Sequence, residues 1–246
     1  MISLKSLRAL GRADALSVGR DSLLRGMVLV PLGLAVAARW LFPQALASIG
    51  ALIQIDLQVH YPLFMSYVLL LLAPLISGAV VGFVLLDQRD DGTLTALQVT
   101  PLPLAAYLAY RLAAPMLLSL AMTLLALPIA GLVALRPLDL LLLALSAAPL
   151  APLCALFLGA YAANKVQGFA LQKALGVFML APFIGSLLPA PLNLLVGLVP
   201  TYWPAALLWA LADGNAHAWL LLPIGLAYQG ALLWGLLRRF RRVLSS

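Results

Sequence analysis

The stretch that decides the fold is Asp87-Gln-Arg-Asp-Asp-Gly-Thr-Leu-Thr-Ala-Leu-Gln-Val-Thr-Pro101. It is the longest strongly polar interruption in the middle of a very apolar chain, and it contains three of the eight acidic residues. One long apolar run ends at Leu86, and another begins just after Pro103. We therefore expect the polar stretch to connect two membrane-length segments.

The same stretch has the pattern of a short capped helix. Asp90 or Asp91 can accept hydrogen bonds from the free backbone N–H groups of a first turn, and a carboxylate suits the positive end of a helix. Leu94 and Leu97 would share one face, and Pro101 would end the helix. Because a helix of about two turns is not stable alone in water, its leucines need the bilayer surface, another part of the chain or a partner protein. A plain interfacial loop is the alternative.

The sequence from Gln88 to Leu102 resembles the signature of ABC-2 type exporter permeases. That signature reads Glu-Arg-Glu-x-Gly-Thr-Leu-Glu-x-Leu, then Thr-Pro or Ser-Pro, between the second and third membrane helices. Gln88 and Thr95 replace two of its acidic residues here, whereas Gly-Thr-Leu and Thr-Pro are intact. The likeness is greatest to the small drug-exporting branch, the fluoroquinolone exporters, which Pro200-Thr-Tyr-Trp-Pro204 also resembles.

In that family the segment is a cytoplasmic coupling helix that touches the ATPase subunit. The resemblance implies that the coupling residues of this chain are Gln88, Arg89, Asp90, Asp91, Gly92, Thr93, Leu94, Leu97, Thr100 and Pro101.

The composition indicates an all-α integral membrane protein. Of its 246 residues, 64% are hydrophobic and only 9% are charged, against about 25% charged in a typical soluble domain. About 20 apolar residues cross a bilayer as a helix, and long Leu/Ala/Val runs favour helices over the alternating strands of a β-barrel. Cys154 is the only cysteine, which excludes an intrachain disulfide and a cysteine cluster for metal.

Residues 3–24 are expected to form an amphipathic helix at the membrane surface. Leucines and alanines recur there at roughly helical spacing between basic residues, which suits contact with anionic lipid. A specific binding role is the alternative to this anchoring one. No compact apolar core with a small-residue cleavage site indicates a signal peptide in this region.

Six membrane spans follow within one domain, 1–246. We expect them at about residues 26–42, 61–86, 104–135, 140–162, 171–188 and 219–237. With six spans, 13 of the 15 Lys and Arg residues lie on one side, and only Arg39 and Arg136 lie on the other. Basic residues accumulate on the cytoplasmic side, so the pattern predicts an inner (plasma) membrane protein with both termini in the cytoplasm.

The region 189–213 carries four prolines and no Lys or Arg, and it is too broken for one straight helix. We predict a re-entrant or interfacial hairpin on the outer side, before the sixth helix. Its aromatic residues form either an outer aromatic belt or a lining for an apolar substrate. Arg111, near the cytoplasmic start of the third span, is either an interface anchor or a substrate contact. The residues considered for a substrate pathway are Tyr202, Trp203, Asn193 and Arg111.

A second polar segment, from Asn164 to Lys173, is expected on the cytoplasmic side. It is either a second contact for a partner or a plain loop. The net charge of +7 comes from residues that flank the spans, so it gives no indication of nucleic-acid binding.

The sequence contains no nucleotide-binding loop and no zinc-protease or serine-hydrolase motif. We therefore predict a transport subunit with no catalytic residue, cofactor or metal of its own. ATP and Mg²⁺ would bind a separate ABC-type ATPase, and two copies of this chain, or this chain with a related permease, would form the pathway for an amphipathic drug, lipid or peptide. A non-transporting membrane protein of the same fold, such as an immunity or assembly factor, is the alternative; an intramembrane enzyme is a third.

Overall fold

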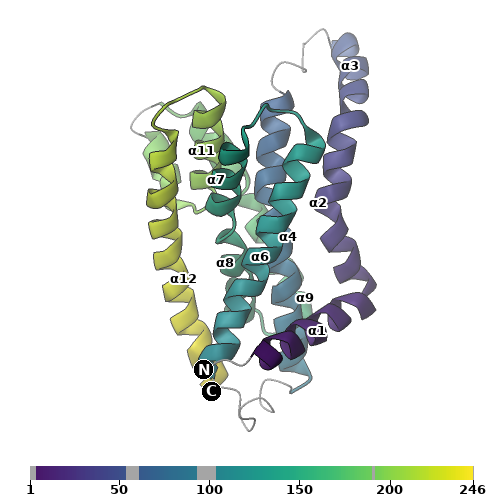
Figure 1. Cartoon of the computed structure of the whole chain (residues 1–246), viewed down its shortest axis with the longest axis vertical. Helices are drawn as coiled ribbons and strands as arrows, with labels where there is room; N and C mark the ends of the chain where they lie inside the picture. Colours follow the sequence, from purple (N-terminus) through teal and green to yellow (C-terminus); the bar gives the residue numbers. More distant parts are fainter. Residues whose placement is uncertain (1–3, 54–60, 93–103, 190–191, 246) are drawn as a thin grey trace.

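The computed structural model describes residues 4–53, 61–92, 104–189 and 192–245, and these residues form helices and turns without any strand. Figure 1 shows an elongated bundle whose long helices run along its longest axis, with both termini at the same end. Six helical segments are long and apolar enough to cross a membrane, so the predicted six-span helical fold is confirmed. The helices are α1 (Leu4–Arg20), α2 (Ser22–Trp40), α3 (Phe42–Ile53), α4 (Tyr61–Asp90), α6 (Leu104–Ala130), α7 (Pro137–Ala147), α8 (Leu150–Tyr161), α9 (Lys165–Val177), α10 (Leu180–Leu187), α11 (Tyr202–Ala212) and α12 (Leu221–Ser245), with 3₁₀ helices η1 (Leu192–Leu198) and η2 (Ala218–Leu220).

The main differences between the helix boundaries and the sequence-based ones lie in four places. The expected loop after the first span begins with α3, and the third span ends at Ala130, where Gly131 adopts a φ of 58° that favours glycine. The fourth span is divided into α7 and α8 around Pro149, which cannot donate a helical hydrogen bond. The fifth begins earlier than expected, at Lys165, and is divided into α9 and α10.

Helix α4 is the centre of the bundle. In its most apolar 18-residue window, 83% of the residues are buried, the largest share among the six candidate spans. Small residues let α8 approach it closely: a Cβ added at Gly78 would lie 2.3 Å from the carbonyl oxygen of Ala151, and one at Gly82 would lie 2.8 Å from Leu158. This close packing fixes α8 against α4 and positions the ends of both helices.

At the end of the bundle opposite the termini, side chains join neighbouring helices by donating hydrogen bonds to backbone carbonyl groups. The Tyr61 hydroxyl donates to the carbonyl of Ala38, and the Arg39 guanidinium donates to the carbonyl of Ile129 at 3.1 Å. Arg39 also lies against Gly131, where a Cβ would be only 2.8 Å from its Nη1. These hydrogen bonds therefore join the start of α4 and the ends of α2 and α6 at the same end of the bundle.

Helix α1 lies across the terminus-bearing end of the bundle, at an angle to α2 (Figure 1). The two helices meet at Asp21, whose carboxylate accepts hydrogen bonds from the backbone N–H groups of Leu23 (2.9 Å) and Leu24 (3.2 Å). An aspartate in this position stabilises the start of a helix. The sequence therefore encodes the bend between the surface helix and the first span.

After α9 the chain turns back on itself. The Thr201 hydroxyl donates to the carbonyl of Phe178 at 2.7 Å, and Gly185 packs against Val196. Helix α10 and η1 therefore lie side by side, and α11 starts beside Phe178, the C-cap residue of α9. Trp209 of α11 then stacks on Tyr67 near the start of α4, with ring centroids 5.8 Å apart.

Candidate functional site

The polar stretch begins as the last turn of α4. Asp87, Gln88, Arg89 and Asp90 are helical, and Gly92, with a φ of 67°, ends the helix by donating to the carbonyl of Arg89. Asp90 is the last residue of α4, and the short helix that Asp90 or Asp91 is predicted to cap lies outside the described residues. The remaining coupling candidates, Thr93, Leu94, Leu97, Thr100 and Pro101, lie outside the described residues.

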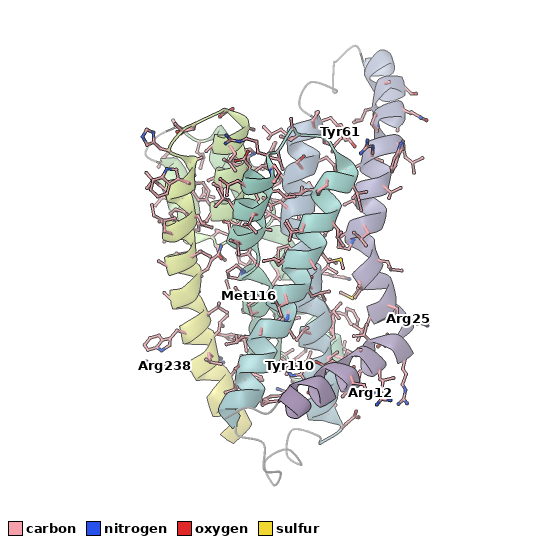
Figure 2. The ribbon with its side chains drawn as sticks, viewed as in Figure 1. Arg12, Arg25, Tyr61, Tyr110, Met116 and Arg238 are labelled. Carbon is pink, nitrogen blue, oxygen red and sulfur yellow. The ribbon has the colours of Figure 1, made fainter. Side chains whose placement is uncertain are left out.

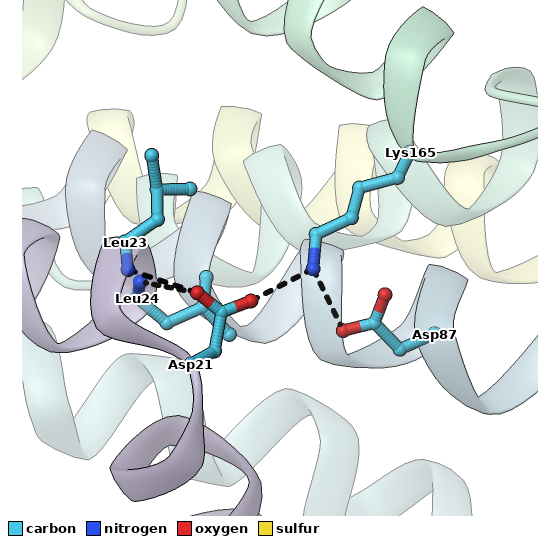
Figure 3. Close-up of polar contacts among 5 residues, drawn as sticks. All are labelled: Asp21, Leu23, Leu24, Asp87 and Lys165. Carbon is cyan, nitrogen blue, oxygen red and sulfur yellow. Dashed lines mark hydrogen bonds and ion pairs between the residues drawn. The ribbon is translucent and has the colours of Figure 1, made fainter.

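Asp87 is joined to the start of α2 through a lysine. Figure 3 shows Lys165 Nζ between two carboxylates, 2.9 Å from Asp21 Oδ2 and 3.1 Å from Asp87 Oδ2. The hydrogen bond from Lys165 and the two from backbone N–H groups lower the pKa of Asp21 below its usual value. Three elements that are distant in sequence, the starts of α2 and α9 and the end of α4, thus share one lysine.

Arg89 joins the end of α4 to the end of α8. Its Nη2 donates to the carbonyl oxygens of Ala162 at 2.7 Å and Ala163 at 2.5 Å. Ala162 is the C-cap residue of α8, and a cation suits the negative end of a helix. A side chain from α4 therefore bonds the carbonyl groups of the two residues that directly follow α8.

Gln88 forms the third connection, to α6. Its Oε1 accepts from Arg111 Nη2 at 2.5 Å and from the Tyr107 hydroxyl at 3.2 Å. Arg111 also forms an ion pair with Asp14 Oδ2 of α1 at 2.7 Å, and the Tyr110 hydroxyl donates to the same oxygen at 2.7 Å. Figure 2 shows Tyr110 where α1 crosses α6.

Arg111 is completely buried, whereas Asp14 is 15% exposed. Arg111 Nε and Asp14 Oδ1 have no hydrogen-bond partner within the described residues. Removing a guanidinium and a carboxylate from water costs several kcal/mol per ion, which is repaid only by good geometry and further hydrogen bonds. The side chain of Arg111 thus lies inside the bundle, bonded to α1 and α4, and not on an exposed surface.

The other candidate pathway residues lie elsewhere. Trp203 Nε1 donates to the carbonyl of Gly197 at 3.1 Å, its ring packs edge-on against Tyr202, and its Cβ would lie 2.8 Å from a Cβ added at Gly225. Asn193 lies in η1. In Figure 1, α11 lies toward the end opposite the start of α6, so Arg111 is not brought together with these residues.

Asp14 and Asp21 are the functional candidates that sequence reasoning missed. Each is an acidic residue among the basic residues of the surface helix predicted at 3–24. Their partners, Arg111 and Lys165, lie 97 and 144 residues away. Only the unusual presence of acids in this segment hinted at their pairing.

No group of three or more His, Cys, Asp or Glu side chains able to hold a metal ion occurs in the part of the chain that the structure describes. Cys154 is buried and donates weakly to Gln172 Oε1 at 3.2 Å. His217 precedes η2; its backbone N–H donates to Asn215 Oδ1 at 2.9 Å, and its carbonyl accepts from the N–H of Leu220 at 3.0 Å.

Comparison with known proteins assigns the family. Residues 14–237 match the family model described as "Fluoroquinolones export permease protein Rv2686c-like". Two curated proteins of Mycobacterium tuberculosis, the fluoroquinolones export permease proteins Rv2686c of strain H37Rv and MT2760 of strain CDC 1551, are each 33% identical over 241 residues, covering 96% of this chain and 94% of theirs. No solved structure matches the chain. With six helices able to cross a membrane and a match over nearly its whole length, the chain belongs to the fluoroquinolones export permease family of multi-pass membrane transport proteins.

Proposed function

We propose that this chain is the membrane-spanning subunit of an ATP-binding-cassette exporter, driven by ATP that a separate ATPase subunit hydrolyses. The family assignment supports a permease, and the resemblance of residues 88–102 to the ABC-2 signature supports an ATPase partner. The sequence contains no Gly-x4-Gly-Lys-Ser/Thr loop with which to bind ATP phosphates itself.

One observation carries this proposal: the end of α4 is bonded to every neighbouring element at its level. Asp87 connects to α2 and α9 through Lys165, Arg89 to the end of α8, and Gln88 to α6 and, through Arg111, to α1. A force on the segment that follows Gly92 would reach the spans through these bonds. Nucleotide-driven closure of two ATPases would tilt α4 and α6 as rigid bodies.

The orientation follows from the positive-inside rule. Arg12, Arg25 and Arg238 lie toward the end of the bundle that carries both termini (Figure 2), whereas α3, which follows the end of α2 that carries Arg39, lies at the other end (Figure 1). We place the terminus-bearing end in the cytoplasm and the protein in the inner membrane. Helix α1 would then lie at the inner membrane surface, and the end of α4 would face the ATPase.

The returning chain from α10 through η1 to α11 supports a re-entrant hairpin open to the outer side. Thr201, at its turning point, is buried and bonded to Phe178. Irregular backbone at this depth is stable only where protein covers it or a cavity adjoins it. Tyr202 and Trp203 would face the outer part of the pathway, while Arg111 contributes to coupling and not to substrate contact.

The substrate would be an amphipathic compound. The printed names of the two relatives make fluoroquinolones the first compounds to test. Two copies of the chain would enclose the pathway, and the two least buried spans, Lys165–Gly185 with 17% and Ala218–Phe240 with 11% of the window buried within one copy, offer apolar surface for such pairing.

Co-expression and reconstitution with a candidate ABC-type ATPase from the same organism test the proposal. The tagged chain should retain this ATPase during purification, and the complex should move a fluorescent fluoroquinolone across vesicles when ATP is supplied. Gly92→Pro and Leu94→Asp should leave assembly of the permease intact but abolish ATP-driven transport. Failure to bind any ATPase, or unchanged transport in both variants, would instead favour a non-transporting protein of the same fold.

A further inference from the structure

An apolar cavity of about 240 Å³ lies beside α8, away from the polar end of α4. Leu150, Cys154 and Phe157 of α8 form its floor, while Leu232 and Leu236 of α12 form one wall and Phe178 lies in the other. The two walls belong to the least buried spans, with 11% of the window buried for α12 and 17% for α9 with α10. The cavity therefore lies between two helices that face the surroundings of the bundle.

Aromatic contacts connect the cavity residues of α8 to a cationic side chain of α12, Arg239. Phe157 packs on Tyr161 of the next turn, with ring centroids 4.8 Å apart, and the Arg239 guanidinium carbon lies 4.1 Å from the Tyr161 ring centroid. On α12, Arg239 follows Leu232 and Leu236 by seven and three residues, so all three share one helix face. The surface is thus apolar in its middle and positive near the terminus-bearing end.

Arg239 is exposed, and within the described residues its only recorded interaction is with the Tyr161 ring. Its N–H groups are therefore available to an external acceptor. A planar guanidinium binds a phosphate or carboxylate through two parallel hydrogen bonds. Apolar surface with an adjoining free guanidinium suits an amphipathic molecule that carries an anionic group.

The size of the cavity favours one class of amphipathic ligand over another. Pockets for drug-sized molecules typically occupy about 300–1,000 Å³, more than the volume of about 240 Å³ of this cavity. A narrow, flexible chain fits a smaller space than a rigid ring system does. An apolar cavity of this kind also excludes water, so a hydrocarbon chain entering from the bilayer would fill it.

We propose that this cavity binds one acyl chain of an anionic phospholipid, and that Arg239 binds the phosphate. The occupant belongs to the leaflet at the terminus-bearing end of the bundle, because Arg239 lies there. The proposal is independent of the ATPase, since no residue of the polar end of α4 lines the cavity.

Native mass spectrometry of the protein released from nanodiscs of equal phosphatidylglycerol and phosphatidylcholine content tests the proposal. The wild-type chain should retain about one phosphatidylglycerol in preference to phosphatidylcholine. Arg239→Gln should lower this retention at least fivefold, whereas Arg238→Gln, which removes the same charge from a residue packed on Trp234, should not. Leu232→Trp, which fills the cavity, should also displace the lipid, whereas Ala231→Trp on the exposed neighbouring position should not.

Three results would overturn the proposal. Equal retention of phosphatidylglycerol in the two arginine variants would exclude the phosphate contact. Retention unaffected by Leu232→Trp would exclude the cavity. Loss of a dimer peak in place of a lipid adduct in Leu232→Trp would assign the surface to a second copy of this chain. Should Leu232→Trp fail to fold, the two arginine variants still decide the outcome.

Discussion

The guanidinium of Arg111 lies 2.7 Å from the carboxylate of Asp14, although the two residues are 97 positions apart and the chain between them includes three of the six candidate spans in whole or in part. The pair joins the surface helix α1 to α6, and Gln88 extends the connection to α4. A buried charge of this kind is costly when its partner is removed. The contact between the surface helix and the bundle is therefore sensitive to single substitutions.

Asp14→Asn is expected to destabilise the protein strongly, because it leaves the buried guanidinium of Arg111 without its counter-ion. Breaking a buried ion pair typically costs about 3–5 kcal/mol. Thermal unfolding in nanodiscs should show a clear fall in Tm, and the double variant Asp14→Asn with Arg111→Met should recover more than half of it. Arg12→Gln, on the same helix but exposed, should change the free energy of unfolding by less than about 0.5 kcal/mol. An Asp14→Asn protein as stable as this control would contradict the buried pair.

Asp21 should make stability depend on pH only in acid. Lys165 and two backbone N–H groups lower the pKa of this carboxyl below its model-compound value of 3.8. A carboxyl with a lowered pKa adds stability that is fully present above its unfolded pKa and is lost as the pH falls through the folded one. The difference in Tm between wild type and Asp21→Asn should therefore stay constant from pH 8 to about pH 5 and shrink below about pH 4. A difference that already changes between pH 7 and pH 6 would mean that another group titrates there.

Gly78→Val should prevent close packing of α4 on α8. A Cβ at this position would lie 2.3 Å from the backbone oxygen of Ala151, which cannot rotate away. Overpacking of this kind typically costs about 1–3 kcal/mol or more, so folded yield in fluorescence-detected size-exclusion chromatography should fall sharply. Gly235→Val on α12, where a Cβ meets nothing within 4 Å, is the matched control. Equal yields of the two variants would show that α4 and α8 lie further apart than described.

Single cysteines should report the orientation of the bundle. In a Cys154→Ser background, Val166→Cys at the start of α9 should react with an impermeant maleimide only after the inner side of spheroplasts is opened. Ala216→Cys, in the turn after α11, should react in intact spheroplasts. Both positions are exposed in the structure. The reverse labelling pattern would place the polar end of α4 outside the cell and exclude its contact with an ATPase.

The sequence could predict the six spans because a run of about 20 apolar residues carries its own signal. It could not predict where prolines divide the spans, since Pro74 lies inside the continuous α4 whereas Pro149 separates α7 from α8. Packing against neighbouring helices decides such cases, and the local pattern does not record it.

The polar contacts were less predictable than the spans. Gln88 and Arg89 were identified as candidates through a resemblance, yet their partners are a buried arginine and two backbone carbonyls. Backbone carbonyls have no sequence signature. The role of Lys165 as a bridge depends on three helix ends lying close together. The sequence alone does not show which helix ends are neighbours in the fold.

The length of α4 has a consequence of its own. Its 30 residues make a rod of about 45 Å, while the hydrocarbon layer of a bilayer is only about 30 Å thick. With its first residue tied to the carbonyl of Ala38, the surplus length emerges at the opposite end. We therefore expect Asp87, Gln88 and Arg89 to lie beyond the hydrocarbon layer, where water and a large partner protein can reach them.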